Sequence, residues 1–223
     1  MNSKSVSHSW NALFSSLAFA EKAAANECLK IAKRFREDGL NDLADEYEGL
    51  ADEENQHHNL ALSVARKIVP LTERAGTVYD GGFFSRDGSV LERLMSVHFV
   101  FEPSALAFLG YISRHSRDLF EDRQWADQIT KAFNQILRDE VHHVQNGGVV
   151  IKRFWSSATD QEKKVALKTM RKHRAFLKAG LLSFFSQIEI KKEVVSKMLE
   201  RFDFYYEKSV KGVFDGEPAK AAS

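Results

Sequence analysis

Four stretches of the sequence carry apolar residues at steps of three and four, and each of these helical stripes is interrupted by a glutamate. In chain order, the four glutamates are Glu21, Glu54, Glu102 and Glu140. Burial of unpaired carboxylates is costly, so the stripes predict a helical core in which cations offset this charge. No lysine or arginine shares the stripes next to these residues, which favours metal ions as the cations.

Two of the stripes also supply a histidine three residues after the glutamate, in Glu54-x-x-His57 and Glu140-x-x-His143. This spacing places both side chains on adjacent turns of one helix face. Four carboxylates and two imidazoles are a donor set that suits two divalent first-row metal ions. The sequence therefore predicts a two-metal centre inside a helical bundle.

Glu27 is an alternative to Glu21 as the ligand from the first helix. Counted from the turn that joins the first two helices, Glu27 matches the depth of Glu54 better than Glu21 does. Its face carries further charged residues and is expected to lie in water, whereas the face of Glu21 is apolar. We therefore prefer Glu21.

Helix-stop signals divide the first part of the chain. Gly39 is expected to end the first helix and Pro70 the second. Residues 70–88 contain several glycines and have the length of a crossover along a bundle, which predicts that the second and third helices run parallel. Ser89 and Glu92 form a candidate capping box at the start of the third helix, and Pro103 is expected to bend that helix.

The length of 223 residues suits one well-formed core. We predict an all-α chain with a four-helix bundle and two additional C-terminal helices. The expected divisions are a single domain over 1–215, with the bundle over about 8–157, the additional helices over about 160–179 and 183–212, and a flexible tail at 216–223.

The charge and cysteine content limit the binding partners and the cellular compartment that can be expected. The chain has 32 basic and 31 acidic residues, so it has no overall electrostatic attraction to nucleic acid or to an anionic membrane. The single cysteine, Cys28, excludes an intramolecular disulfide and suits the cytoplasm. We expect no membrane span. The run at 12–19 imitates a secretion signal but fits better as part of an amphipathic helix.

Several of these motifs resemble, in type and spacing, those of bacterioferritin and rubrerythrin in the ferritin-like di-iron carboxylate superfamily: Glu21, Gly39-Leu40, Glu54-x-x-His57 and Leu137-Arg138-Asp139-Glu140-x-x-His143. The resemblance covers residues from about 10 to 155. It implies a ferritin-like bundle with two iron ions, manganese being an alternative at one or both positions. It also implies bridging by Glu54 and Glu140, with Glu21 and His57 completing one position and Glu102 and His143 the other.

The residue before each bridging glutamate is also acidic, and a metal-bound imidazole normally donates its second ring N–H to a carboxylate. By resemblance to di-iron oxygenases, Asp139 is expected to accept from His57, and Glu53 from His143. His98 lies one turn before the third glutamate. We expect it beside the metal site or a cavity, rather than on the metal.

Small residues surround the predicted ligands at Ala24, Ala25, Ala105 and Gly147. They leave space either for a substrate cavity or for close helix packing, and the sequence favours neither. Tyr47 also lies on a core stripe. We interpret it as a core tyrosine, with a role as radical or proton donor as the alternative.

The chain departs from storage and peroxide-scavenging members, because it lacks a cysteine-rich segment and continues for about 60 residues past the bundle. In this it resembles aldehyde-deformylating oxygenases and the tRNA-modifying hydroxylase. We expect an enzyme that activates dioxygen or peroxide to oxidise a small organic substrate with an unidentified electron donor. The alternatives are a ferroxidase, metal-storage or peroxide-scavenging protein, and a tRNA-directed hydroxylase.

The stretch 163–178 is rich in lysine and arginine and contains no acidic residue. A solvated helix face is the ordinary interpretation. A docking surface for an acidic carrier protein or for tRNA is the alternative, and it predicts salt-sensitive binding. A homo-oligomer is also compatible with the sequence.

Overall fold

The computed structural model describes residues 3–67, 88–187 and 190–214. The helices are α1 (Ser3–Glu37), α2 (Asn41–Val64), α4 (Val90–Ser96), α5 (Glu102–Leu119), α6 (Arg123–Ser157), α7 (Asp160–Gln187) and α8 (Lys192–Phe214). A π-helical segment, Val97–Phe101, joins α4 to α5. No strand occurs in these ranges, which confirms the prediction of an all-α chain.

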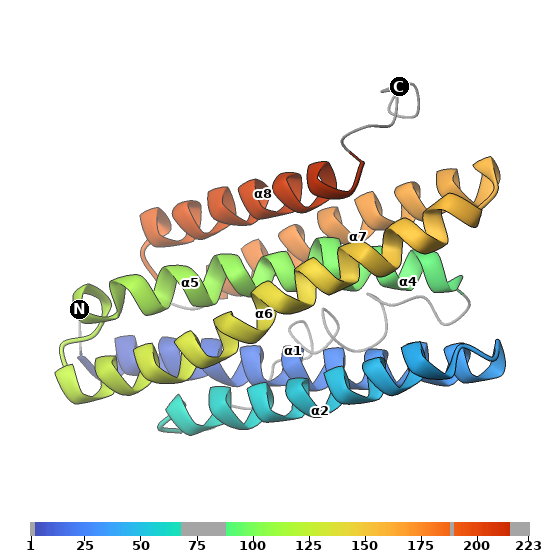
Figure 1. Cartoon of the computed structure of the whole chain (residues 1–223). Helices are drawn as coiled ribbons and strands as arrows, with labels where there is room; N and C mark the ends of the chain where they lie inside the picture. The colour runs from blue at the N-terminus through green and yellow to red at the C-terminus, as the bar shows by residue number, and fades with distance from the viewer. Residues whose placement is uncertain (1–2, 68–87, 188–189, 215–223) are drawn as a thin grey trace.

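The helices form two antiparallel pairs, α1 with α2 and α5 with α6 (Figure 1). Helices α2 and α5 run in the same direction, as predicted from the expected crossover (Figure 1). The crossover itself and Pro70 lie outside the described residues. Helix α8 packs along α5, and α7 packs against α4, so the two C-terminal helices cover one side of the bundle.

Gly39 ends α1, as predicted. It has a φ of +74°, a left-handed conformation that costs a residue with a Cβ about 1 to 2 kcal/mol. The Leu40 amide donates to the Phe35 carbonyl at 2.8 Å, and the Gly39 amide donates to the Arg36 carbonyl at 3.1 Å. These bonds satisfy the last carbonyls of α1 and turn the chain into α2.

The third helix begins and is interrupted where its sequence signals lie. Ser89 and Glu92 form the predicted capping box, with backbone-to-side-chain bonds of 3.1 and 3.3 Å. Pro103 is expected to bend the helix; what the structure shows directly before it is the π-helical segment, in which the Glu102 amide donates to the Val97 carbonyl. Pro103 has no N–H to donate, and the wider turn precedes it directly.

The prediction that α2 extends to Pro70 is wrong, because α2 ends at Val64 and the next residue is extended. The Val64 carbonyl accepts a hydrogen bond of 2.8 Å from the Trp125 indole. Arg66 then places its guanidinium 4.4 Å from the centre of the Trp125 ring and pairs with Asp122. A tertiary contact with the start of α6 therefore ends α2 before the proline is reached.

The predicted break between residues 179 and 183 is also wrong. Helix α7 continues through Gly180 to Gln187, and α8 begins only at Lys192. Leu177, Leu181 and Phe185 bury one stripe of α7 across that position. This packing outweighs the weak helix propensity of a single glycine.

We expect no membrane span, yet one helical stretch of the described residues, Val90–Leu119, is long and apolar enough to cross a membrane by length and composition. Its most apolar window is 94% buried within the protein. The core helix of a bundle has the same properties, so the stretch is weak evidence for a membrane span.

Aromatic side chains close the bundle core at one end. Phe14 of α1 lies 5.5 to 6.1 Å, between ring centres, from Phe120, Trp125 and Phe133. Glu21 follows Phe14 by two turns of α1, about 10 Å further along the bundle. The polar residues of the four stripes therefore lie deep inside the bundle, and this aromatic cluster separates them from its end.

The left-handed turn at Gly39 leads to a stability prediction. Gly39→Ala should destabilise the fold by about 1 kcal/mol, because alanine is strained at this φ although no atom obstructs its Cβ. The matched control is Gly49→Ala, at an open position within α2, which should stabilise by about 0.5 to 1 kcal/mol. Denaturant unfolding measures both changes, and equal shifts in the two variants would contradict the analysis.

Candidate metal centre

The six side chains predicted as metal ligands converge inside the bundle from α1, α2, α5 and α6. They form two groups, and the donor atoms within each lie within 4.8 Å of one another. One group is Glu21, Glu54, His57 and Glu140, and the other is Glu54, Glu102, Glu140 and His143. All six residues are at most 2% exposed. Glu54 and Glu140 belong to both groups, which is the arrangement expected of bridging carboxylates.

Both imidazoles point their Nδ1 atom toward carboxylates. His57 Nδ1 lies 3.4 Å from Glu54 and 3.3 Å from Glu140. His143 Nδ1 lies 3.2 Å from Glu54, 3.7 Å from Glu102 and 3.8 Å from Glu140. Donor atoms that bind one ion at about 2.0 to 2.2 Å lie about 3 to 4 Å apart, so these separations suit shared metal ions.

The opposite nitrogen of each ring faces an acidic residue on the other helix of the pair α2 and α6. His57 Nε2 lies 3.2 Å from Asp139, and His143 Nε2 lies 2.8 Å from Glu53. Both expected hydrogen bonds are therefore present. Donation of the Nε2 hydrogen to a carboxylate leaves the Nδ1 lone pair directed inward and raises its basicity.

The inward donor atoms are buried and have no hydrogen-bond partner among the residues that the structure describes. They are Glu21 Oε2, both oxygens of Glu54, Glu102 Oε2, both oxygens of Glu140, His57 Nδ1 and His143 Nδ1. A buried polar atom left without a partner costs about 1 to 3 kcal/mol, and more when it is charged. Oxygen and imidazole donors that converge in this way fit a pair of divalent first-row metal ions.

Mutual proximity shifts the pKa values of these groups. Burial and the neighbouring glutamates raise the pKa of Glu21 and Glu140 well above its usual value. Burial acts in the same direction on Glu54, but the imidazoles of His143 and His57 outweigh it and lower the Glu54 pKa to about 2. Burial acts to lower the His57 pKa, but Glu54 and other carboxylates raise it to about 9. Without cations, the cluster therefore has to retain protons.

Glu27 is not part of this cluster, yet it does not lie in water as expected. It is completely buried and pairs with Arg93 of α4 and, at 3.1 Å, with Lys30. The face of Glu27 is covered by α4, which the pattern of α1 alone does not show. This carboxylate is compensated by arginine and lysine, whereas no lysine or arginine of the described ranges pairs with the glutamates of the cluster.

His98 belongs to neither donor group and is held by Tyr47 and Gly147. The Tyr47 hydroxyl and His98 Nε2 lie 2.6 Å apart, and both residues are buried. Burial lowers the His98 pKa to about 4, so the ring is neutral. A Cβ on Gly147 would lie only 2.0 Å from the His98 ring. Gly147 therefore makes room for His98 and not for a substrate.

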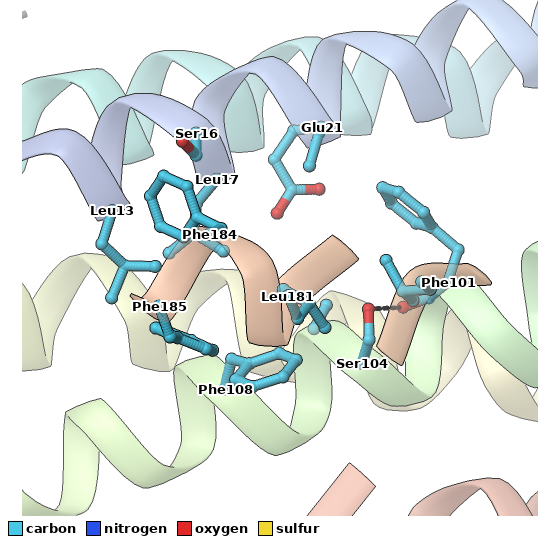
Figure 2. Close-up of a pocket in the computed structure, with 13 residues that line it drawn as sticks. Leu13, Ser16, Leu17, Glu21, Phe101, Ser104, Phe108, Leu181, Phe184 and Phe185 are labelled. Carbon is cyan, nitrogen blue, oxygen red and sulfur yellow. Dashed lines mark hydrogen bonds between the residues drawn. The ribbon is translucent and has the colours of Figure 1, made fainter. Parts of the chain in front are cut away.

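A narrow apolar cavity lies beside Glu21, whose carboxylate points toward it (Figure 2). Its volume is about 20 Å³, room for about one water molecule, so a larger molecule can occupy it only if its walls move apart. Of the four small residues predicted around the ligands, Ala105 lines it, whereas Ala24, Ala25 and Gly147 do not. Tyr47, also a candidate for a cavity, does not line it either. The remaining walls are Leu13, Ser16, Leu17, Ala20, Phe101, Ser104, Phe108, Leu177, Leu181, Phe184 and Phe185.

The contribution of α7 to this cavity was missed at the level of sequence. Leu177, Leu181, Phe184 and Phe185 lie more than 150 residues after Glu21 and form one side of the cavity (Figure 2). The sequence feature that indicates these residues is the apolar stripe at the C-terminal end of α7. The predicted break between residues 179 and 183 divides that stripe between two helices.

The contact between Gly147 and His98 leads to a second prediction. Gly147→Ala should destabilise the protein by about 1 to 3 kcal/mol, because the ring and its bond to Tyr47 have to move. The control is Gly110→Ala, where the nearest atom to the new Cβ lies at 3.5 Å, an ordinary contact. That variant should be neutral or slightly more stable. Thermal or denaturant unfolding compares them, and a neutral Gly147→Ala would refute the packing argument.

No protein-family model and no curated protein matches this sequence. Among solved structures, the chain is similar to "Protein 19 with aldehyde deformylating oxidase activity from Synechococcus". The TM-score is 0.76 at 19% sequence identity, and the match covers 99% of this chain and 95% of that chain. At this identity, the similarity shows the fold. Together with the arrangement of α1, α2, α5 and α6, it establishes that the chain has the ferritin-like helical-bundle fold predicted from its motifs.

Proposed function

We propose that this chain is a di-iron enzyme of the oxygenase type that uses dioxygen to oxidise an apolar organic substrate. The observation that carries the proposal is the double position of Glu21. This carboxylate belongs to the buried donor cluster and also lines the apolar cavity. A substrate in the cavity is thereby adjacent to the residues that hold the metal ions.

In this proposal, Glu54 and Glu140 hold both ions, because each belongs to both donor groups. The terminal ligands are Glu21 and His57 at one position and Glu102 and His143 at the other. When bound, a pair of iron ions supplies the electrons for the reduction of dioxygen, and manganese at one or both positions is the alternative. A separate electron donor has to restore these electrons after each turnover.

The chain itself orients ligands and excludes water. Asp139 and Glu53 fix the two imidazole rings by accepting their outward N–H groups. The phenylalanines and leucines of the cavity surround the apolar part of a substrate and keep bulk water from Glu21. The structural neighbour is described by its aldehyde deformylating oxidase activity, which supports aldehydes as the first substrate class to examine.

The apolar lining favours an organic substrate over iron as a substrate. Among the described residues, the polar side chains that line the cavity are those of Glu21, Ser16 and Ser104. A hydrated metal ion on its way to storage needs polar groups in exchange for its water. We therefore place storage and a tRNA-directed reaction among the outcomes that the experiments below can reveal.

The shared positions of the carboxylates lead to a prediction on metal content. Glu140→Ala should lose both ions, because a bridging carboxylate serves both, whereas Glu21→Ala should retain about one iron per chain. Iron is measured after anaerobic reconstitution of each variant, with circular dichroism as the control for folding. Equal iron contents in the two variants would overturn the bridging assignment.

The reaction is tested by dioxygen consumption of the reconstituted protein with a chemical reductant and aldehydes of increasing chain length. Apolar aldehydes should stimulate consumption. Leu181→Trp, which fills the cavity, should raise their KM by about tenfold or more and leave the iron content unchanged. Leu182→Trp is the matched control, because Leu182 is 48% exposed and does not line the cavity.

Other outcomes would redirect the proposal. Assembly into a cage with a mineral core, and no stimulation by any aldehyde, would indicate storage. Stimulation by tRNA that weakens steeply with salt would indicate a nucleic-acid-directed reaction. Equal KM values for the Leu181 and Leu182 variants would show that the substrate does not occupy this cavity.

A further inference from the structure

A surface groove lies between α5, α6 and α8, separate from the cavity at Glu21. It consists of two adjoining hollows of about 360 and 410 Å³, which share Leu106, Val141 and Tyr205. Helix α8 lies on the side of α5 that faces away from α1 and α2 (Figure 1). None of the residues that line the groove also lines the internal cavity.

One hollow is apolar and open. Val141 is 47% exposed and Val149 is 70% exposed, so two turns of α6 present apolar side chains to solvent. Opposite them, Gly212 of α8 has no atom within 4 Å of the position of a Cβ, so it leaves the wall open. From Val141 to Val149, this wall extends for about 12 Å along α6.

The other hollow contains a guanidinium group that lacks an anion. Arg201 donates from Nη2 to the Tyr205 hydroxyl at 3.0 Å. Its Nε is buried and has no hydrogen-bond partner, and Arg201 forms no ion pair with any residue in the described ranges. Arg174 on α7, in contrast, pairs with Asp203 at 2.8 Å. An arginine with an unused donor in a hollow that adjoins an apolar one fits a carboxylate ligand.

The charge of the groove points the same way. Arg114, Lys152, Arg201 and Lys208 line it, and no acidic residue does so among the described residues. Along α8, Arg201, Tyr205, Lys208 and Gly212 recur at steps of three and four, on one face. Arg114 and Arg201 line the hollow away from Gly212, whereas Lys152 and Lys208 border the apolar hollow.

We propose that this groove is a binding site for a single-chain amphiphile with a carboxylate head, such as a fatty acid. The carboxylate pairs with Arg201 beside Tyr205, and the alkyl chain covers Val141 and Val149 and ends near Gly212. The site does not depend on the metal centre. It is therefore present whether or not the proposed oxidation takes place.

The test is calorimetric titration of the full chain with dodecanoate below its micelle concentration. Dodecanol and acetate serve as probes that lack the charge or the tail. Dodecanoate should bind, and the affinity of each of the other two probes should be at least about tenfold lower. Arg201→Gln should weaken dodecanoate binding about tenfold, and Gly212→Leu should do the same by filling the apolar hollow.

Matched variants separate this site from the alternatives. Lys164→Gln, at an exposed lysine of α7, and Leu181→Trp, in the internal cavity, should both leave dodecanoate binding unchanged. The Glu140→Ala variant should also bind dodecanoate, which keeps this test distinct from that of the metal centre.

Three results would overturn the proposal. The first is equal affinity for dodecanoate and dodecanol. The second is loss of binding in Leu181→Trp but not in Gly212→Leu, which would place the acid in the internal cavity. The third is a dimer in sedimentation experiments that dodecanoate does not dissociate and Gly212→Leu does, which would show that a second copy occupies the groove.

Discussion

The structure depends on the electrostatic cost of a cluster of buried carboxylates that no lysine or arginine among the described residues compensates. Glu27 shows the ordinary solution, since its buried carboxylate is neutralised by Arg93 and Lys30. Within the described part of the chain, Glu54 and Glu140 have no arginine or lysine partner, and their oxygens face other donors of the cluster. A fold that keeps them together gains from metal ions and loses without them. The bundle, the closing aromatic cluster and the outer hydrogen bonds all serve to hold this cluster at one depth.

The donor cluster was predictable because it relies on local spacing. A glutamate and a histidine three residues apart share a helix face whatever surrounds the helix, as with Glu54 and His57. The end of α2 was not predictable in this way. It is set by Trp125, which lies more than 60 residues from Val64 and takes its carbonyl. Helix ends determined by tertiary contacts leave no mark in the sequence that precedes them.

The space around the cluster was harder to infer than the cluster itself. From the sequence alone, a small residue is equally compatible with a cavity and with close helix packing. Gly147 proved to be a contact, because the His98 ring fills the position of its missing Cβ, whereas Ala105 lines a cavity. The difference depends on what the facing helix supplies. For the cavity, that helix is α7, and its packing could be known only once α7 was placed beside α4.

The two outer carboxylates, Asp139 and Glu53, make one side of the centre accessible to solvent, whereas the other side is apolar. The side chains of Asp139 and Glu53 are 43% and 49% exposed, although the imidazoles they contact are almost completely buried. Each ring N–H is therefore one hydrogen bond away from a group that water can reach, on the side of α2 and α6. The apolar cavity opens toward Glu21 on the opposite side, among α1, α5 and α7. The groups that water can reach and the apolar cavity thus lie on separate faces of the same bundle, so the proposed substrate and the exchangeable protons need not share one route.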